Sequence, residues 1–208
     1  MAEIIVVHGN PGSGKSTQCD LLVESGWSNQ AVIHLSAGNR LRDIRTGRTD
    51  SRFSSIINDP NAPSPLPDQT VNDAIFELLP GQLNKQQQVL ALIDGYPRHA
   101  GAVDVFLREL EIGHHTLLGV VALKVSLEVS IERILSRGKR EGEKVEADSL
   151  REYATQRFEQ DKETTEQALI KLGHFTVVRT IDASDTKDNV SDRFRSAVSD
   201  LVDNPLYI

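Results

Sequence analysis

The chain has 208 residues, of which 38% are hydrophobic and 25% charged, a composition typical of a folded globular protein and unlike disordered or fibrous chains. No apolar run reaches the ~20 residues of a membrane-spanning helix, and the net charge of -7 argues against nucleic-acid binding. The single cysteine, Cys19, excludes an internal disulfide and a multi-cysteine zinc site. We therefore expect a monomer in the reducing cytoplasm that binds neither membrane nor nucleic acid and holds no zinc.

Short segments rich in Val and Ile alternate along the chain with longer amphipathic segments. Such near-continuous apolar runs are typical of strands that are buried on both faces of a sheet. Apolar stripes at helical spacing lie in residues 102–110 and 190–201. The alternation of strands and helices predicts an α/β fold with a parallel sheet. The predicted strands are residues 4–8, 31–34, 89–93, 119–125 and 174–178.

Two segments interrupt this alternation. The first, residues 35–70, contains the proline-rich stretch 59–67, which predicts a loop between helices because proline removes backbone donors. The second, residues 137–148, is rich in Gly, Lys, Arg and Glu and has almost no apolar residue to bury, which predicts an exposed, mobile flap. We therefore expect a single domain whose core comprises about residues 1–34, 71–136 and 149–208.

The first predicted strand leads into a glycine-rich segment, Gly9 to Ser16, that matches the phosphate-binding-loop pattern. A helical pattern follows at once, so backbone N–H groups and the positive end of a helix would converge on phosphate oxygens. Lys15 would reach the β- and γ-phosphates, and the hydroxyl of Ser16 would bind Mg²⁺. The bland alternative is a glycine-rich turn that binds nothing. The motif favours a nucleotide-binding protein over that alternative.

A second motif, Asp94-Gly95-Tyr96-Pro97-Arg98, follows the third predicted strand. Ligands of open α/β sheets gather at the carboxyl ends of strands. There Asp94 could hold the water shell of Mg²⁺, and the guanidinium of Arg98 could bind a phosphate through two N–H groups. Alternatively, Asp94-Gly95 is a plain turn and Arg98 a surface residue.

Further arginines gather around the two inserts. Five of them lie between Arg40 and Arg52, and they form either a clamp for a phosphorylated ligand or a solvated face. Arg133 and Arg137 stand four residues apart and so share a helix face before the flap, and Arg157 follows the flap. Arginines on both sides of a hinged segment are typical of phosphoryl transfer, where fixed cations must converge on the transferred group.

Together these motifs resemble the adenylate kinase family of nucleoside monophosphate kinases in its short-lid form, which includes uridylate–cytidylate kinases. The resemblance covers nearly the whole chain in order, and residues 94–98 are its most specific part. It implies a three-layer α/β sandwich around a five-stranded parallel sheet, with a monophosphate-binding insert at 35–70 and a short lid at 137–148. It also implies reversible transfer of the γ-phosphoryl group of MgATP to a nucleoside monophosphate.

The resemblance assigns roles to individual residues by position. Catalytic roles fall to Lys15, Arg98, Arg133, Arg137 and Arg157. ATP binding falls to Asn10, Pro11, Gly12, Ser13, Gly14, Lys15, Ser16, Thr17, Arg133 and Arg137. Monophosphate binding falls to Ala37, Gly38, Arg42, Leu66, Gly95, Tyr96, Arg98, Ala102 and Arg157. Magnesium would be held by Ser16 and, through water, by Asp94.

The chain departs from the family where the acceptor base would bind. Adenylate kinases usually have Thr at the position of Ala37 and an adenine-reading Gln near Ala102, and an alanine side chain cannot hydrogen-bond to a base. The usual arginine in the middle of the lid corresponds to Arg140 or Lys144. We therefore expect an AMP-type acceptor whose base the sequence leaves open. Two alternatives also stay open: an ATP-dependent kinase for another phosphorylated small acceptor, and a nucleotide-binding regulator without turnover.

Overall fold

The computed structural model describes residues 1–28, 30–79, 88–140 and 147–205, without the side chains of residues 137–140, 147–148 and 150. Five strands form one all-parallel sheet in the order β2-β3-β1-β4-β5. This confirms the predicted α/β fold with a five-stranded parallel sheet. The strands are β1 (Glu3–Gly9), β2 (Ala31–Ser36), β3 (Val89–Asp94), β4 (Thr116–Lys124) and β5 (Val178–Asp182).

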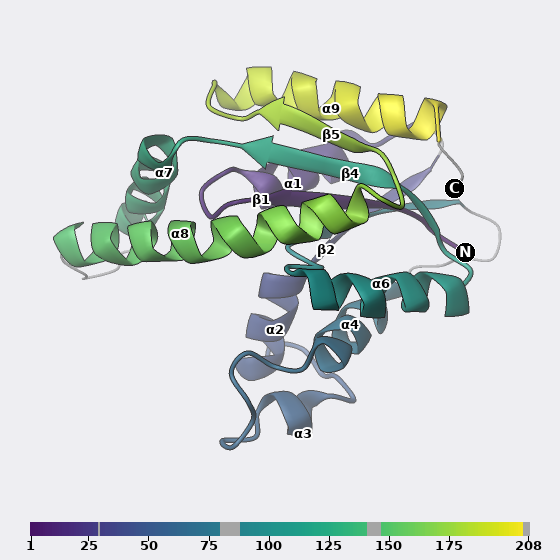
Figure 1. The fold of residues 1–208 in the computed structure, drawn as a ribbon, viewed down its shortest axis with the longest axis horizontal. Helices are drawn as coiled ribbons and strands as arrows, with labels where there is room; N and C mark the ends of the chain where they lie inside the picture. The colour runs from purple at the N-terminus through teal and green to yellow at the C-terminus, as the bar shows by residue number, and fades with distance from the viewer. Residues whose placement is uncertain (29, 80–87, 141–146, 206–208) are drawn as a thin grey trace.

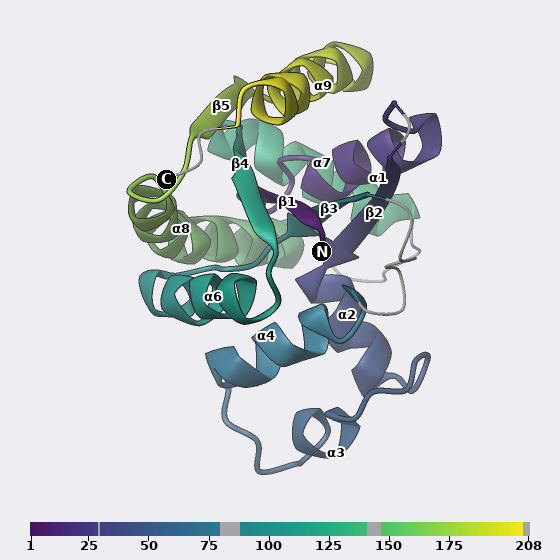
Figure 2. The ribbon, with the colours of Figure 1, turned by 90° about the vertical axis from the view of Figure 1, so that its right-hand side faces the viewer.

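Helices cover both faces of the sheet, which makes the three layers visible in Figures 1 and 2. Because successive side chains of a strand point to opposite faces, Ile4 and Val6 of β1 pack on one side while Ile5 and Val7 pack on the other. The first side is covered by α6 (Ala100–Ile112) and α8 (Ala147–Leu172). The second is covered by α1 (Lys15–Ser25) and α9 (Lys187–Asp203).

The predicted fifth strand, residues 174–178, was wrong except at its last residue. Residues 173–176 instead form turns directly after α8, where the N–H groups of Gly173 and Thr176 donate to the carbonyls of Leu169 and Leu172. These N–H groups bond to carbonyls of α8 and not to β4. Pairing with β4 begins only at Val178, opposite Val120. An apolar run does not distinguish the end of a helix from a buried strand, which explains the error.

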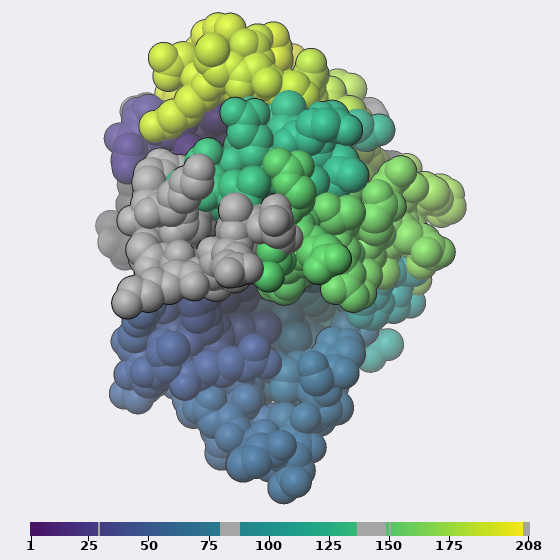
Figure 3. All heavy atoms as spheres, turned by 90° about the vertical axis from the view of Figure 1, so that its left-hand side faces the viewer, coloured from purple at the N-terminus to yellow at the C-terminus, as the bar shows by residue number. Residues whose placement is uncertain are grey.

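The first predicted insert carries three helices, namely α2 (Ala37–Arg45), α3 (Ser54–Ile57) and α4 (Asp68–Phe76). They project below the sheet in Figure 1, and in the space-filling view of Figure 3 they form a mass below α7 and α8. A small core of their own holds them together, made by Ile44, Ile57, Leu66 and Ala74. The proline-rich stretch 59–67 contains no helix or strand, as predicted.

The second predicted insert is helical at both ends. Helix α7 (Leu127–Arg140) continues three residues beyond Arg137, and α8 begins at Ala147, so helical structure extends into both edges of the predicted flap at 137–148. Charged residues such as Lys, Arg and Glu have high helix propensity, so they extend a helix without burying apolar surface. Residues 141–146 lie outside the described residues. Among the helices that the structure describes, none is long and apolar enough to cross a membrane.

Candidate active site

The candidate site lies where the carboxyl ends of β1 and β3 meet. From β1 the chain crosses to β2, on one side of β1 in the sheet, whereas from β3 it crosses to β4, on the other side. The direction of the connections therefore reverses between the adjacent strands β1 and β3. Such a reversal opens a crevice outside the strand ends, where α/β sheets bind their ligands. The glycine-rich loop follows β1, and the Asp94–Arg98 motif begins at the last residue of β3. The fold therefore brings together the two motifs that the sequence singled out.

The glycine-rich loop has the conformation that an anion site needs. Gly12 and Gly14 adopt φ values of 77° and 91°, a region that other L-residues rarely enter. Helix α1 starts directly after Gly14 with no side-chain cap, whereas Ser36 and Thr186 cap α2 and α9. The first-turn N–H groups of α1 are thus left for a negatively charged ligand, and the helix dipole adds positive potential there.

Lys15 lies within this loop, with its ammonium group turned back on the backbone. Its Nζ donates hydrogen bonds to the carbonyls of Gly9 at 2.6 Å and Asn10 at 3.2 Å. Burial lowers the pKa of Lys15, and nearby Arg98 lowers it further, whereas Asp94 opposes the shift. Burial and the charge of Lys15 also lower the pKa of His8 to about 4. His8 is therefore neutral at pH 7, so it adds no repulsion to this cation.

The carboxylate of Asp94 links α1, β2 and β3. Ser16 donates a hydrogen bond to its Oδ2 at 2.5 Å, and His34, from β2, lies 3.5 Å from the same oxygen. Burial alone would raise the pKa of Asp94, but His34, Lys15 and the Ser16 hydrogen bond together lower it. Asp94 is therefore a buried anion next to the loop.

His34 lies between two carboxylates, those of Asp20 and Asp94. Its Nδ1 lies 2.7 Å from Oδ1 of Asp20, on α1, while its Nε2 faces Asp94. Burial would lower the pKa of His34, but the two carboxylates outweigh burial and raise it above the usual value. The sequence analysis assigned no role to His34 or Asp20. Their link depends on β2 lying beside β3, which no local pattern specifies.

Ser16 and Asp94 also supply the donor atoms that Mg²⁺ prefers, a hydroxyl and a carboxylate oxygen. The two oxygens lie 2.5 Å apart beside the glycine-rich loop, so these residues fit a magnesium ion bound with the phosphates. No group of three or more His, Cys, Asp or Glu side chains that could hold a metal ion by themselves was found in the described part of the chain.

Helix α7 packs against the glycine-rich loop. The buried hydroxyl of Ser130 donates to the carbonyl of Pro11 at 2.5 Å. Arg133 donates to the carbonyls of Gly12 and Ser13 at 3.4 and 3.5 Å and to that of Asp185 at 3.1 Å. Arg133 therefore lies against the glycine-rich loop. A cavity of about 270 Å³ opens beside it, lined by Val129, Glu132, Arg133, Ser136 and Ser184.

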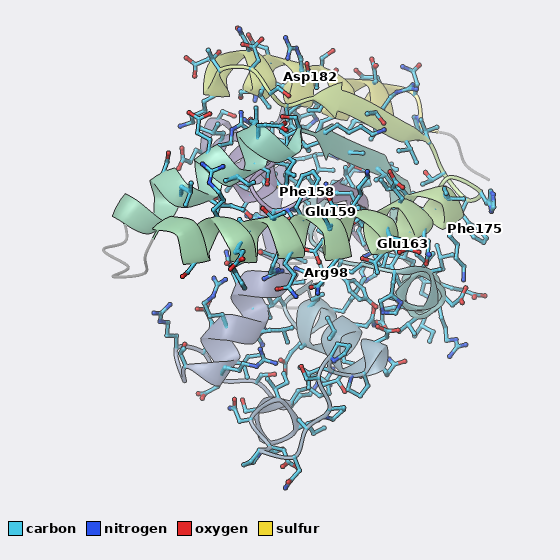
Figure 4. All side chains as sticks on the ribbon, turned by 60° about the vertical axis from the view of Figure 1, so that its left-hand side comes forward. Arg98, Phe158, Glu159, Glu163, Phe175 and Asp182 are labelled. Carbon is cyan, nitrogen blue, oxygen red and sulfur yellow. The ribbon has the colours of Figure 1, made fainter. Side chains whose placement is uncertain are left out.

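Arg98 and Arg42 are exposed, and each is hydrogen-bonded to a neutral group. Nε of Arg98 donates to the carbonyl of Gly95 at 2.9 Å, and Arg42 donates to the side-chain oxygen of Asn39 at 2.9 Å. Arg98 lies between α8 and the helices of the insert in Figure 4. Neither guanidinium is paired with a carboxylate in the hydrogen bonds and ion pairs of the described residues. Both are therefore available to a phosphate.

Other predicted acceptor residues are buried in protein contacts. Tyr96 and Ala102 belong to the main core, where the Tyr96 hydroxyl donates to the carbonyl of Ala102 at 3.4 Å. Leu66 packs in the small core of the insert. Ala37 is also buried, and with Gly38 it begins α2 directly after β2. The structure thus places Ala37 and Gly38 near the strand ends, while the side chains of Tyr96, Ala102 and Leu66 contact the protein interior.

The arginines around the predicted lid are described only in part. Arg157, on α8, donates to the hydroxyl of Tyr153 at 3.2 Å and to the carboxylate of Asp161 at 3.4 Å. The side chains of Arg137 and Arg140 and the whole of Lys144 lie outside the described residues. The sequence analysis missed Tyr153 and Asp161, although each stands four residues from Arg157, the spacing at which helix side chains meet.

Comparison with known proteins agrees with this geometry. A profile of the adenylate kinase family matches residues 7–202. The chain is 31% identical to a UMP-CMP kinase of Danio rerio over 193 residues, covering 90% of this chain and 92% of the relative. It is 31% identical to adenylate kinase isoenzyme 1 of Homo sapiens over 189 residues, covering 90% of each chain. An adenylate kinase of Rhodopirellula baltica is 30% identical over 187 residues, covering 89% of this chain and 90% of the relative. The chain therefore belongs to the adenylate kinase family.

Proposed function

We propose that the protein transfers the γ-phosphoryl group of MgATP reversibly to a nucleoside monophosphate. The observation that carries this proposal is that the glycine-rich loop lies beside the Asp94 carboxylate at the sheet edge, with Arg133 hydrogen-bonded to the loop. The loop suits the phosphates of a donor nucleotide, and Arg98 and Arg42 suit an acceptor that already bears a phosphate. Family membership and the names of the relatives support the same reaction.

In the proposed reaction the chain works mainly by positioning and by electrostatic stabilisation. The transferred group spreads negative charge over its equatorial oxygens, so cations that already surround it lower the barrier. Lys15 would leave its backbone acceptors for the β- and γ-phosphates, and Arg133 would support the loop from α7. Arg98 and Arg42 would orient the acceptor phosphate, while Arg137 and Arg157 would converge on the group in transit. Mg²⁺, bound with ATP beside Ser16 and Asp94, would neutralise phosphate charge.

We propose that the insert at 35–70 and the lid at 137–148 close on the core at residues 1–34, 71–136 and 149–208 around both substrates. Closure would exclude water and so suppress hydrolysis of ATP. The partners required are ATP and a nucleoside monophosphate. We propose that the protein acts as a monomer in the cytoplasm. One chain would suffice for the reaction, because it carries both the loop proposed to bind ATP and the arginines proposed to bind the acceptor phosphate.

The acceptor is proposed to be of the AMP type, with its base left open. Ala37 and Ala102 are both buried and offer no polar side-chain atom to a base edge. A pocket without such groups discriminates weakly between bases. The relatives include both adenylate and UMP-CMP kinases, so their names favour neither acceptor.

A direct test measures nucleoside diphosphate formation from MgATP with AMP, dAMP, CMP, UMP, GMP and dTMP. Lys15→Ala provides the background, and Lys162→Ala, on the surface of α8, provides the matched control. We expect turnover of at least one monophosphate, unchanged in Lys162→Ala and about 100-fold lower in Lys15→Ala. If the folded protein binds MgATP but turns over none of these acceptors, the proposal fails. The remaining candidates would then be an unusual phosphorylated acceptor or a regulator without turnover.

A further inference from the structure

Arg157 differs from the other cations of the candidate site in what holds it. Lys15, Arg42, Arg98 and Arg133 all donate to neutral oxygens of the backbone or of an amide. Arg157 instead donates to a carboxylate, that of Asp161. Of the site cations with described side chains, it is the one with an anionic partner in the chain itself.

Three residues on one face of α8 form this arrangement. Tyr153, Arg157 and Asp161 follow each other at intervals of four residues, so their side chains lie in one row along the helix. The Tyr153 hydroxyl accepts one hydrogen bond from Arg157, whose guanidinium carbon lies 6.0 Å from the centre of the Tyr153 ring. The Asp161 carboxylate accepts from the other end of the guanidinium at 3.4 Å. The hydrogen bond from Arg157 to Tyr153 raises the pKa of the guanidinium, and the charge of Asp161 adds to this effect.

The Asp161 carboxylate is partly buried on α8. Its side chain is 29% exposed, and that of Arg157 is 40% exposed. The negative charge of Asp161 also acts on Lys15, whose pKa it raises against the effect of burial. The Asp161 carboxylate thus pairs directly with Arg157 and also contributes negative potential at Lys15.

We propose that Asp161 is an internal counter-ion of the phosphate site, which neutralises Arg157 until nucleotide phosphates displace it. This inference rests on the proposed function, because it takes Arg157 as a phosphate-binding cation. Asp161 is a positioning residue in this scheme and does not contact the reacting atoms. The ligand that displaces it is a nucleoside di- or triphosphate, which offers the guanidinium stronger acceptors than one carboxylate.

The proposal predicts that removal of Asp161 changes nucleotide affinity in the opposite direction to the change expected from a supporting role. If Asp161 held Arg157 in its working orientation, its removal would weaken nucleotide binding. If Asp161 competes with phosphates, its removal strengthens binding, because Arg157 no longer has to give up an ion pair. Partly exposed ion pairs contribute modestly, so the expected gain in affinity is about two- to fivefold.

The decisive comparison is Asp161→Asn against Glu159→Gln. Both variants remove one negative charge from α8, but Glu159 stands two positions from Arg157 and therefore on another face of the helix. Both ADP and MgATP are titrated by calorimetry at 0.05 and 0.5 M salt, and KM and kcat are measured with the best acceptor. We expect Asp161→Asn to lower Kd and KM two- to fivefold at low salt with kcat within twofold. The gain should shrink at high salt, because screening weakens the competing ion pair.

Two further variants separate the possible causes. Asp161→Glu keeps the charge and should return Kd to the wild-type value, and Tyr153→Phe keeps the ring and should change Kd less than Asp161→Asn. The proposed counter-ion role of Asp161 would be overturned by wild-type or weaker nucleotide binding in Asp161→Asn. An equal gain in affinity in Glu159→Gln would overturn it as well. The calorimetric comparison needs no turnover, so it tests Asp161 even if the proposed reaction fails with every acceptor.

Discussion

The hydroxyl of Ser16 donates a hydrogen bond to the carboxylate of Asp94, which stands 78 positions later in the chain. Ser16 lies in the first turn of α1 and Asp94 ends β3, so the bond joins the two motifs that the sequence singled out. His34 approaches the same carboxylate from β2. The resulting network fixes the position of a buried anion beside the loop that would hold phosphates.

Replacement of Arg98 tests whether a two-pronged contact holds the acceptor phosphate. In Arg98→Ala the acceptor loses a cation, and in Arg98→Lys it keeps a point charge without the planar pair of donors. We expect kcat/KM for the monophosphate to fall about 100-fold or more in the alanine variant and about 10-fold or more in the lysine variant. The unfolding temperature should stay close to wild type, because the side chain is exposed and, among the described residues, hydrogen-bonds to the Gly95 carbonyl alone. Equal kcat/KM in all three proteins would remove Arg98 from the acceptor site.

Gly12→Ala tests the contact between the glycine-rich loop and α7. A Cβ atom there would lie 2.6 Å from the carbonyl oxygen of Ser130, so the loop or the helix must move. Gly26→Ala is the matched control, since its φ of 73° is also positive while nothing lies within 4 Å. We expect ATP affinity to fall at least 10-fold in Gly12→Ala. Gly26→Ala should keep wild-type affinity and lose about 1–3 kcal/mol of stability, because its backbone conformation is one that residues other than glycine rarely adopt.

His34 should make the stability of the protein depend on pH. Its folded pKa is raised, so its stabilising effect is complete below the unfolded value of about 6.5 and is lost as pH rises through the folded value. Asp94, whose pKa is lowered, contributes in the opposite direction: its effect is present above about pH 3.9 and is lost in acid. The pair should therefore stabilise the fold most between these two limits.

The measurement compares unfolding temperatures of wild type and His34→Gln between pH 5 and 9. We expect a difference of a few degrees at pH 6 that narrows as pH rises. His174→Gln, an exposed position, serves as the control and should show no such trend. A difference that stays constant across the range would mean that His34 acts by packing rather than by charge.

Arg40 should matter for stability rather than for binding. It is buried, and it pairs with Glu77 at 2.7 Å while also donating to Thr49 and to the carbonyl of Ala74. Arg40→Ala leaves Glu77 without this partner and should cost about 2 kcal/mol of unfolding free energy, measured by denaturant titration. Arg48→Ala removes an exposed pair with Asp43 and should cost less than about 0.5 kcal/mol. Similar losses in both variants would contradict the assignment of Arg40 as a structural residue.

The basic segment from Arg40 to Arg52 shows where the sequence left two interpretations open. Its arginines do not share one environment in the structure. Arg40 is buried against Glu77, and Arg42 stays exposed beside Asn39. Which arginine turns inward depends on where α4 places Glu77, and charge density along the chain carries no information about that.

Local features of the sequence were sufficient wherever their physical cause is local. The glycine-rich loop needs φ values that glycine provides, and the Lys-Ser pair starts a helix directly after it, so the motif identifies itself. The Val- and Ile-rich runs predicted a parallel sheet because such strands are buried on both faces. The run at residues 174–178 failed because apolar residues also end α8, and only pairing with β4 decides where β5 begins.

Tertiary structure alone decided which distant side chains share the site. Ser16, His34 and Asp94 come from three segments that meet because β2, β3 and β1 are neighbours in that order. Strand order follows from packing of the whole sheet, and no single segment encodes it. The pairing of Arg157 with Asp161 is the opposite case: its spacing is visible in the sequence, but its electrostatic effect on Lys15 arises only because α8 packs against β1.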